Sequence, residues 1–128
     1  MQILATSESR TAATVLALID VSPADATQLI NALRRLSAPT ATPLEIAPSD
    51  SAGGQVRLIA RVALADVGCH AGSPASGTSV VYCDLTPGTW EQVTGLLDPF
   101  SRRQQMHAHQ YLSEHGPITW IASTDSTW

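Results

Sequence analysis

The chain contains no lysine, and all seven of its basic residues are arginine. Eleven acidic residues bring the formal net charge to −4, and charged residues make up only 14% of the 128, against about a quarter in typical globular proteins. Neutralisation of phosphate charge dominates the affinity of proteins for nucleic acids. The scarcity of positive charge therefore predicts that the protein has no nucleic-acid partner.

The sequence also lacks a long apolar run. The longest, Ala12 to Ile19, is interrupted by Thr14 and closed by Asp20, whereas a membrane span needs roughly 20 apolar residues. The same run could be the core of a signal peptide, but the positive region before it is a single residue, Arg10. We interpret the run as a buried strand and expect a cytoplasmic protein with no membrane partner.

Only two cysteines are present, Cys69 and Cys83, and neither belongs to a CxxC pair. Free thiols are the ordinary state of cytosolic cysteines, and a disulfide is the alternative. The two residues fall in a predicted loop and a predicted strand at unequal distances from the turn between them. We therefore expect both to be reduced and not to lie opposite one another.

The common catalytic motifs are missing as well. The chain has no P-loop, GxSxG, HExxH or GxGxxG sequence and no zinc-ligand spacing, so we predict no cofactor and no metal. Its length suits one domain over residues 1–128, and its hydrophobic fraction of 44% is that of a globular protein.

What the sequence does contain is a repeated junction. Asp20 to Pro23 and Asp84 to Pro87 read alike 64 positions apart, and each follows a β-rich apolar run. In each copy a strand ends at an acid, and a hydroxyl residue then caps a helix that begins with proline. Apolar residues follow at helical spacing, which predicts two strand–helix units.

Further strands are predicted by alternation over Gln55 to Ala65 and over Ile118 to Ser123. A third helix is predicted from Arg102 to about His115, closed by glycine and proline. The order of elements predicts an α+β, ferredoxin-like βαββαβ sandwich, built from two βαβ units with an extra helix before the last strand. Residues 9–20 also fit helical spacing, so strand and helix both stay open there.

The second junction, Asp84-Leu85-Thr86-Pro87-Gly88, resembles the Asp-x-x-Pro-Gly turn of the amino-acid-binding ACT domains. Those domains are ferredoxin-like and carry this turn after their first strand. Here the first junction has alanine, Ala24, where the second has Gly88. The resemblance implies a small-molecule sensor.

A few residues could carry chemistry. His107, His109 and Tyr111 lie in the predicted third helix, where a histidine could serve as a ligand or general base. Asp20 and Asp84 end strands that the predicted sheet places side by side, which makes them either a carboxylate pair or two helix caps. Together these five residues form a candidate pocket. Cys69 and His70 fall in a Gly- and Ser-rich stretch that we interpret as a loop.

The sheet face away from the predicted helices is the candidate interface. It would carry Arg57, Ile59, Arg61 and Tyr82, with the terminal Trp128 as a further aromatic anchor. We expect a protein partner there, and a homodimer through the same face. The sequence thus predicts a non-catalytic bacterial binding protein, an immunity-like inhibitor that neutralises a toxin or defence component. The alternatives are a small dimeric α+β-barrel enzyme that uses a helix histidine and the ACT-like sensor.

Overall fold

The computed structural model describes residues 1–7, 14–38, 40–46, 56–72, 79–102 and 107–125. Within them lie eight strands, two α-helices and two short 3₁₀ turns that follow the helices. The strands are β1 (Gln2–Ser7), β2 (Thr14–Ile19), β3 (Leu44–Ile46), β4 (Val56–Val62), β5 (Gly68–Ala71), β6 (Ser79–Leu85), β7 (His109–Ser113) and β8 (Ile118–Ser123). The helices are α1 (Pro23–Leu33) and α2 (Pro87–Leu97), and the 3₁₀ turns are η1 (Arg34–Ser37) and η3 (Asp98–Ser101).

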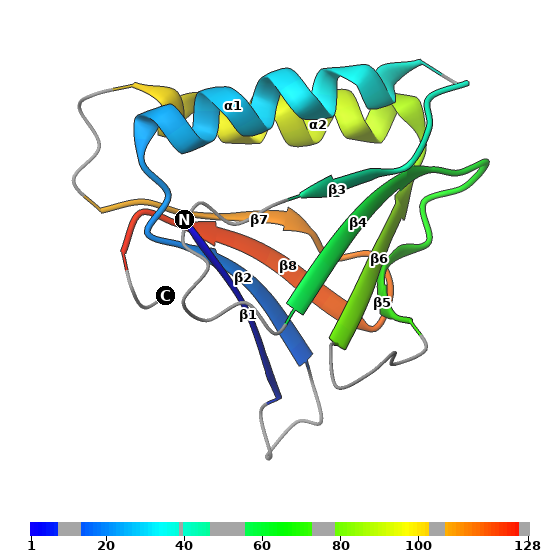
Figure 1. The fold of residues 1–128 in the computed structure, drawn as a ribbon, viewed down its shortest axis with the longest axis horizontal. Helices are drawn as coiled ribbons and strands as arrows, with labels where there is room; N and C mark the ends of the chain where they lie inside the picture. The colour runs from blue at the N-terminus through cyan, green and yellow to red at the C-terminus, as the bar shows by residue number, and fades with distance from the viewer. Residues whose placement is uncertain (8–13, 39, 47–55, 73–78, 103–106, 126–128) are drawn as a thin grey trace.

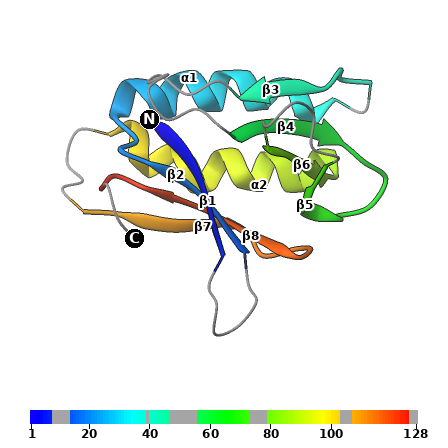
Figure 2. The same ribbon diagram turned by 60° about the horizontal axis from the view of Figure 1, so that its bottom comes forward.

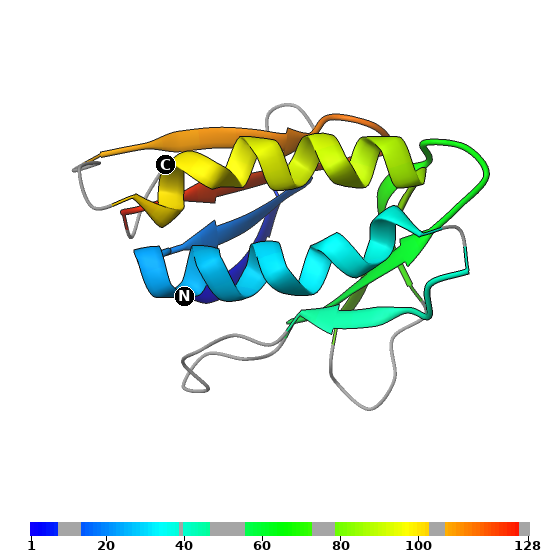
Figure 3. The same ribbon diagram turned by 90° about the horizontal axis from the view of Figure 1, so that it is seen from above.

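All eight strands join one mixed sheet. Its order is β1-β2-β8-β5-β6-β4-β3, with β7 added on β8. The sheet curls into a half-barrel, and the two helices lie side by side and antiparallel across its open side (Figures 1 and 3). Figure 2 shows β1, β2, β7 and β8 as one wall and β3, β4, β5 and β6 as the other. We call the face toward the helices the inner face and the opposite one the outer face.

The predicted ferredoxin-like sandwich is wrong. That topology would place β2 beside β6, but β8 and β5 lie between them. The parallel partner of β2 is β8, and that of β6 is β4. Each wall therefore takes strands from both halves of the chain. An antiparallel strand from the same half, β1 or β5, pairs with one edge of β2 or β6. The other edge pairs with a strand from the distant half, β8 for β2 and β4 for β6.

The chain is nevertheless built from two similar units, β1-β2-α1-β3-β4 and β5-β6-α2-β7-β8. The two predicted strand–helix junctions are confirmed. Ser22 accepts a hydrogen bond from the backbone N–H of Asp25, whose side chain bonds back to Ser22, and Thr86 accepts one from the N–H of Thr89. Proline occupies the first turn of both helices, where its missing N–H costs nothing.

Two further expectations concern helix or strand. Thr14–Ile19 forms a strand, as the repeat predicted, and residues 8–13 lie outside the described residues. The helix expected over Arg102 to His115 is wrong, because His109–Ser113 is strand β7. Leu112 points to the core and Tyr111 to solvent there, an alternation of period two that pairing with β8 satisfies.

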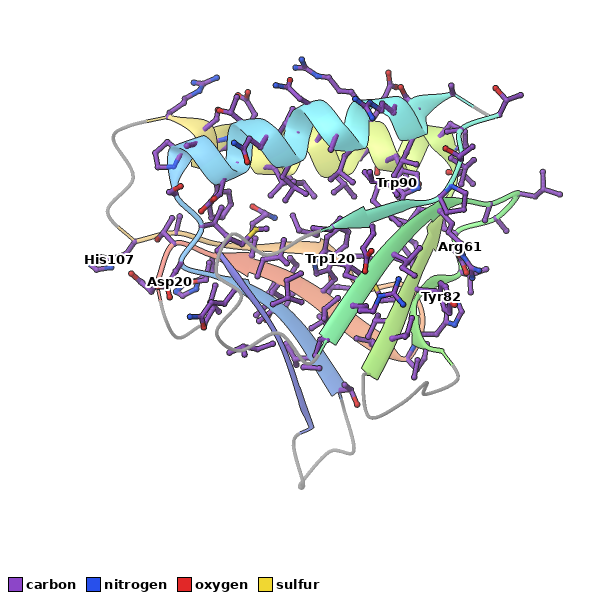
Figure 4. The ribbon with its side chains drawn as sticks, viewed as in Figure 1. Asp20, Arg61, Tyr82, Trp90, His107 and Trp120 are labelled. Carbon is purple, nitrogen blue, oxygen red and sulfur yellow. The ribbon has the colours of Figure 1, made fainter. Side chains whose placement is uncertain are left out.

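The core fills the half-barrel under the helices. Trp90 of α2 and Trp120 of β8 are fully buried at its centre, with ring centroids 6.0 Å apart in an edge-to-face arrangement (Figure 4). The indole N–H of Trp90 donates to the backbone carbonyl of Arg61 at 2.9 Å, which fixes α2 over β4. Neither helix among the described residues is long and apolar enough to cross a membrane.

Candidate functional site

Neighbouring strands of one wall bring four polar or aromatic side chains together on the outer face. In the parallel ladder between β4 and β6, Arg61 pairs with Asp84, and in the antiparallel ladder between β5 and β6, His70 pairs with Tyr82. Alternation turns all four away from the helices, since their neighbours Ala60 and the two cysteines lie in the core. We call Arg61, His70, Tyr82 and Asp84 the outer-face cluster.

Asp84 is the centre of this cluster. Its carboxylate accepts two hydrogen bonds from the guanidinium of Arg61, from Nε at 2.6 Å and from Nη2 at 2.7 Å. Its Oδ2 also lies 2.6 Å from Nε2 of His70. The side chain of Asp84 is only 12% exposed, against 35% for Arg61 and 31% for His70. A two-pronged arginine–carboxylate pair of this kind is rigid as well as strong.

The aromatic ring of Tyr82 contacts two other members of the cluster. The guanidinium carbon of Arg61 lies 4.0 Å from the centre of the Tyr82 ring, which is the distance of a cation–π contact. The ring of His70 also lies near that of Tyr82, with 6.0 Å between the two centroids. Figure 4 shows Arg61 and Tyr82 close together on the wall formed by β4 and β6.

These contacts keep Asp84 ionised. Partial burial by itself raises the pKa of a carboxyl group, but the hydrogen bonds from Arg61 and His70 outweigh it, and the pKa of Asp84 lies below its ordinary value. The same pair raises the pKa of Arg61, chiefly through the hydrogen bond to Asp84. The cluster therefore holds a fixed pair of opposite charges in neutral solution.

The contact between Asp84 and His70 can be compared with that of a catalytic triad. A carboxylate that holds an imidazole occurs in catalytic triads, but there the imidazole also contacts a nucleophile. Among the described residues, the side chain of His70 hydrogen-bonds only to Asp84. Four hollows of about 260 to 400 Å³ are lined by described residues, and none of the four is lined by a residue of the cluster.

The residues proposed as an interface lie as follows. Ile59 and Tyr82 are direct partners in the β4–β6 ladder, with Arg57 and Arg61 on either side of Ile59 along β4. Arg57 is exposed and its Nε lies 2.6 Å from Oε1 of Glu45 on β3. The structure thus brings four of the five onto one face of one wall. Trp128 lies outside the described residues.

The five residues proposed as a pocket are divided between two places. Asp84 belongs to the outer-face cluster, whereas Asp20 and His107 meet at Asp125, at the far end of the other wall (Figure 4). The backbone N–H of Asp20 donates to the carbonyl of Asp125, and Nδ1 of His107 lies 3.1 Å from its carboxylate. His109 and Tyr111 are exposed on β7.

Sequence reasoning missed His70. The stretch around it is not a loop at this point, because Gly68–Ala71 is strand β5. A strand of four residues is too short to show a convincing alternation, and glycine and serine surround it. The available signal was the alternation in β6, whose outward Tyr82 and Asp84 require a polar partner on the neighbouring strand.

The two cysteines also differ from expectation. Both are free, but Cys69 and Cys83 are direct partners in the β5–β6 ladder, so the prediction that they do not lie opposite one another is wrong. The strand assignment of β5 is the reason, since it places Cys69 in register with β6. Within the described part of the chain, no three histidine, cysteine or acidic side chains lie close enough to hold a metal ion.

Comparison with known proteins adds no relationship to this geometry. No protein-family model matches the chain, and neither a curated protein nor a solved structure does.

Proposed function

We propose that this protein is a non-catalytic binding protein that contacts a protein partner through the outer face of β4, β5 and β6. The observation that carries the proposal is the outer-face cluster, in which a carboxylate fixes an arginine and a histidine beside a tyrosine ring. Arginine and tyrosine are among the residues that most often dominate the energy of protein interfaces.

The rigidity of the cluster supports this role. Ordering a flexible arginine on binding costs about 0.5–1.5 kcal/mol. Here the two hydrogen bonds to Asp84 and the contact with Tyr82 already hold Arg61 before any partner arrives. A cluster built on paired strands is also fixed by the sheet beneath it.

The location and the identity of the partner are further parts of the proposal. A cytoplasmic location fits two cysteines that are free thiols. A bacterial toxin or defence component as the neutralised partner stays a prediction. A second copy of the chain is the first partner to examine, because Ile59 and Tyr82 lie together on the proposed face.

The test is a capture experiment with charge-reversed baits. The outer-face variant is Arg57→Glu, whose exposed position leaves the cluster in place. The matched control is Arg35→Glu, because Arg35 is also exposed but lies in η1 beside the helices. We expect wild type and Arg35→Glu to cross-link the same protein from cells of the native host, and Arg57→Glu to lose it.

Either of two results would overturn the proposal: a partner that both variants retain equally, or one that only Arg35→Glu loses. Light scattering of the purified chain at micromolar concentration tests self-association separately. If a dimer forms through this face, Ile59→Asp dissociates it while the circular dichroism spectrum stays that of the folded protein.

A further inference from the structure

The two cysteines form a pair on the inner face, directly behind the outer-face cluster. Cys69 and Cys83 are opposite partners in the antiparallel β5–β6 ladder, and both are fully buried. Their Sγ atoms lie 2.7 Å apart, which is shorter than an ordinary contact between two thiols. A covalent disulfide needs about 2.05 Å, so a small shift of the side chains separates this contact from a bond.

The register of the ladder places the pair in a position that suits a disulfide. Antiparallel partners alternate between hydrogen-bonded pairs and closer, non-hydrogen-bonded pairs. The backbone N–H of Gly72 donates to the carbonyl of Val80, which marks these two as a hydrogen-bonded pair. Cys69 and Cys83 stand three ladder positions further on and are therefore a non-hydrogen-bonded pair. The Cα atoms of such pairs typically lie about 4.5 Å apart, within the roughly 4.4–6.8 Å that a disulfide spans.

We propose that Cys69 and Cys83 form a thiol–disulfide site, which a low-molecular-weight disulfide oxidises to an intramolecular cross-strand bond. One cysteine thiolate attacks the oxidant, forms a mixed disulfide and expels one small thiolate. The second cysteine then attacks the mixed disulfide, forms the Cys69–Cys83 bond and expels the other. The two protons lost by the protein are taken up by the two released thiolates, so one oxidant disulfide is reduced for each bond formed.

In the first unit of the chain, the inward pair that corresponds to Cys69 and Cys83 contains no cysteine and cannot form a disulfide. There the equivalent strands are β1 and β2, and the inward partners are Ile3 and Leu18, two large aliphatic side chains. Packing alone is therefore satisfied by aliphatic residues at this place in the fold. The second unit has two thiols in contact instead.

The disulfide would also be linked to the outer-face cluster, because each cysteine is followed in the chain by a residue of that cluster. His70 follows Cys69 on β5, and Asp84 follows Cys83 on β6, with Nε2 and Oδ2 of these two residues 2.6 Å apart. A disulfide on the inner face would join the same two strands that the His70–Asp84 contact joins on the outer face. The inference concerns the thiols only and does not depend on the proposed binding function.

Oxidation is expected to be slow in the native protein. The hydrogen bond with Cys69, and burial after it, raise the pKa of Cys83, and the thiolate is the reactive form of cysteine. Both sulfurs are also shielded from reagents until β5 opens locally. The rate should therefore rise with pH.

The experiment uses the native chain and oxidised glutathione as the probe. After incubation the protein is denatured, free thiols are alkylated, and the intact mass is measured. We expect a monomer that has lost two hydrogen atoms and carries no alkyl group, and that regains both alkylation sites after reduction. Its urea unfolding midpoint should lie above that of the reduced protein, because the bond restricts the unfolded chain.

The matched controls are Cys69→Ala and Cys83→Ala, each of which leaves one thiol. Neither can lose two hydrogens, and each should give only a glutathione adduct or a linked dimer. Two wild-type results would overturn the proposal and need no variant to fold. One is two alkylated thiols after native incubation under conditions that oxidise the urea-unfolded chain. The other is a glutathione adduct that never resolves to the intramolecular bond.

Discussion

The two walls of the half-barrel have the same scaffold but opposite chemistry on their outer faces. Around β6 that face carries the charged and aromatic outer-face cluster. Around β2 it carries a small apolar cluster whose buried members are Ala17, Ile19 and Ile121. Strand by strand, Asp84 of the second unit takes the place of Ile19, and Tyr82 that of Ala17. One arrangement of strands therefore accepts either a polar network or an apolar cluster at the same positions.

The walls also differ by one residue where strand becomes helix. In the second unit one residue, Asp84, separates the inward residues Cys83 and Leu85. In the first unit two residues, Ile19 and Asp20, separate the inward residues Leu18 and Val21. The extra residue is Asp20, whose backbone has a left-handed φ of 52°. Because of this insertion, the sequence repeat aligns Asp20 with Asp84, whereas the strand positions align Ile19 with Asp84.

The largest loss of stability is expected when an acid is placed in the apolar wall, at the position of Ile19 that corresponds to Asp84 in the polar wall. Ile19 is 3% exposed, and no arginine stands where Arg61 stands in the other wall, since that place belongs to Ser123. Among the described residues, no arginine would pair with a carboxylate at this position as Arg61 pairs with Asp84. Ile19→Asp should lower the free energy of unfolding by about 3–5 kcal/mol, measured by urea denaturation.

The control for that variant is Ile19→Val, which removes one methylene group and should cost about 0.5–1.5 kcal/mol. Equal losses in the two variants would show that Ile19 is not buried from water as the structure has it.

Removing the acid from the polar wall should cost less. Asp84→Ala leaves Arg61 and His70 without their shared acceptor, but both keep partial access to water. We expect the free energy of unfolding to fall by about 2 kcal/mol. Arg57→Ala breaks the neighbouring exposed pair with Glu45 and should leave the unfolding curve unchanged. A similar loss in both variants would contradict the central position of Asp84.

The same pair predicts a dependence on pH. Because the pKa of Asp84 in the folded protein lies below its ordinary value of 3.8, its contribution is complete above that value. The contribution is lost as pH falls from 3.8 through the lower folded value. The difference in unfolding free energy between wild type and Asp84→Asn, measured from about pH 6 to about pH 2, should therefore shrink only at the acid end. A difference that shrank near neutral pH would implicate another group.

The smallest effects are expected at the inserted residue. Asp20→Gly suits a left-handed backbone and should change the free energy of unfolding by about 0.5 kcal/mol or less. Asp20→Val places a β-branched side chain in that conformation and should cost about 1–2 kcal/mol. If thermal unfolding shows the two variants to be equally stable, the insertion does not hold the left-handed turn.

Local features of the sequence predicted the parts of the fold that neighbours along the chain decide. Ser22 and Thr86 with the prolines after them fix the helix starts, because a cap and a fixed φ act within one turn. Alternation over β4 and β8 identified one strand in each wall. The aromatic position of Trp90 identified the buried side of α2.

Contacts between distant segments decided the rest. Backbone hydrogen bonds are the same for any sequence, so nothing in β2 itself selects β8 as its partner over β6. The segment that ends in β7 resembled a helix, because its extended form becomes stable only beside β8.

The outer-face cluster and the cysteine pair follow from the same cause. The sequence by itself determined two capped helices, several strands and the polar or thiol character of single residues. Only the tertiary structure placed His70 against Asp84 and Cys69 against Cys83, because the register of β5 on β6 depends on which faces the sheet buries.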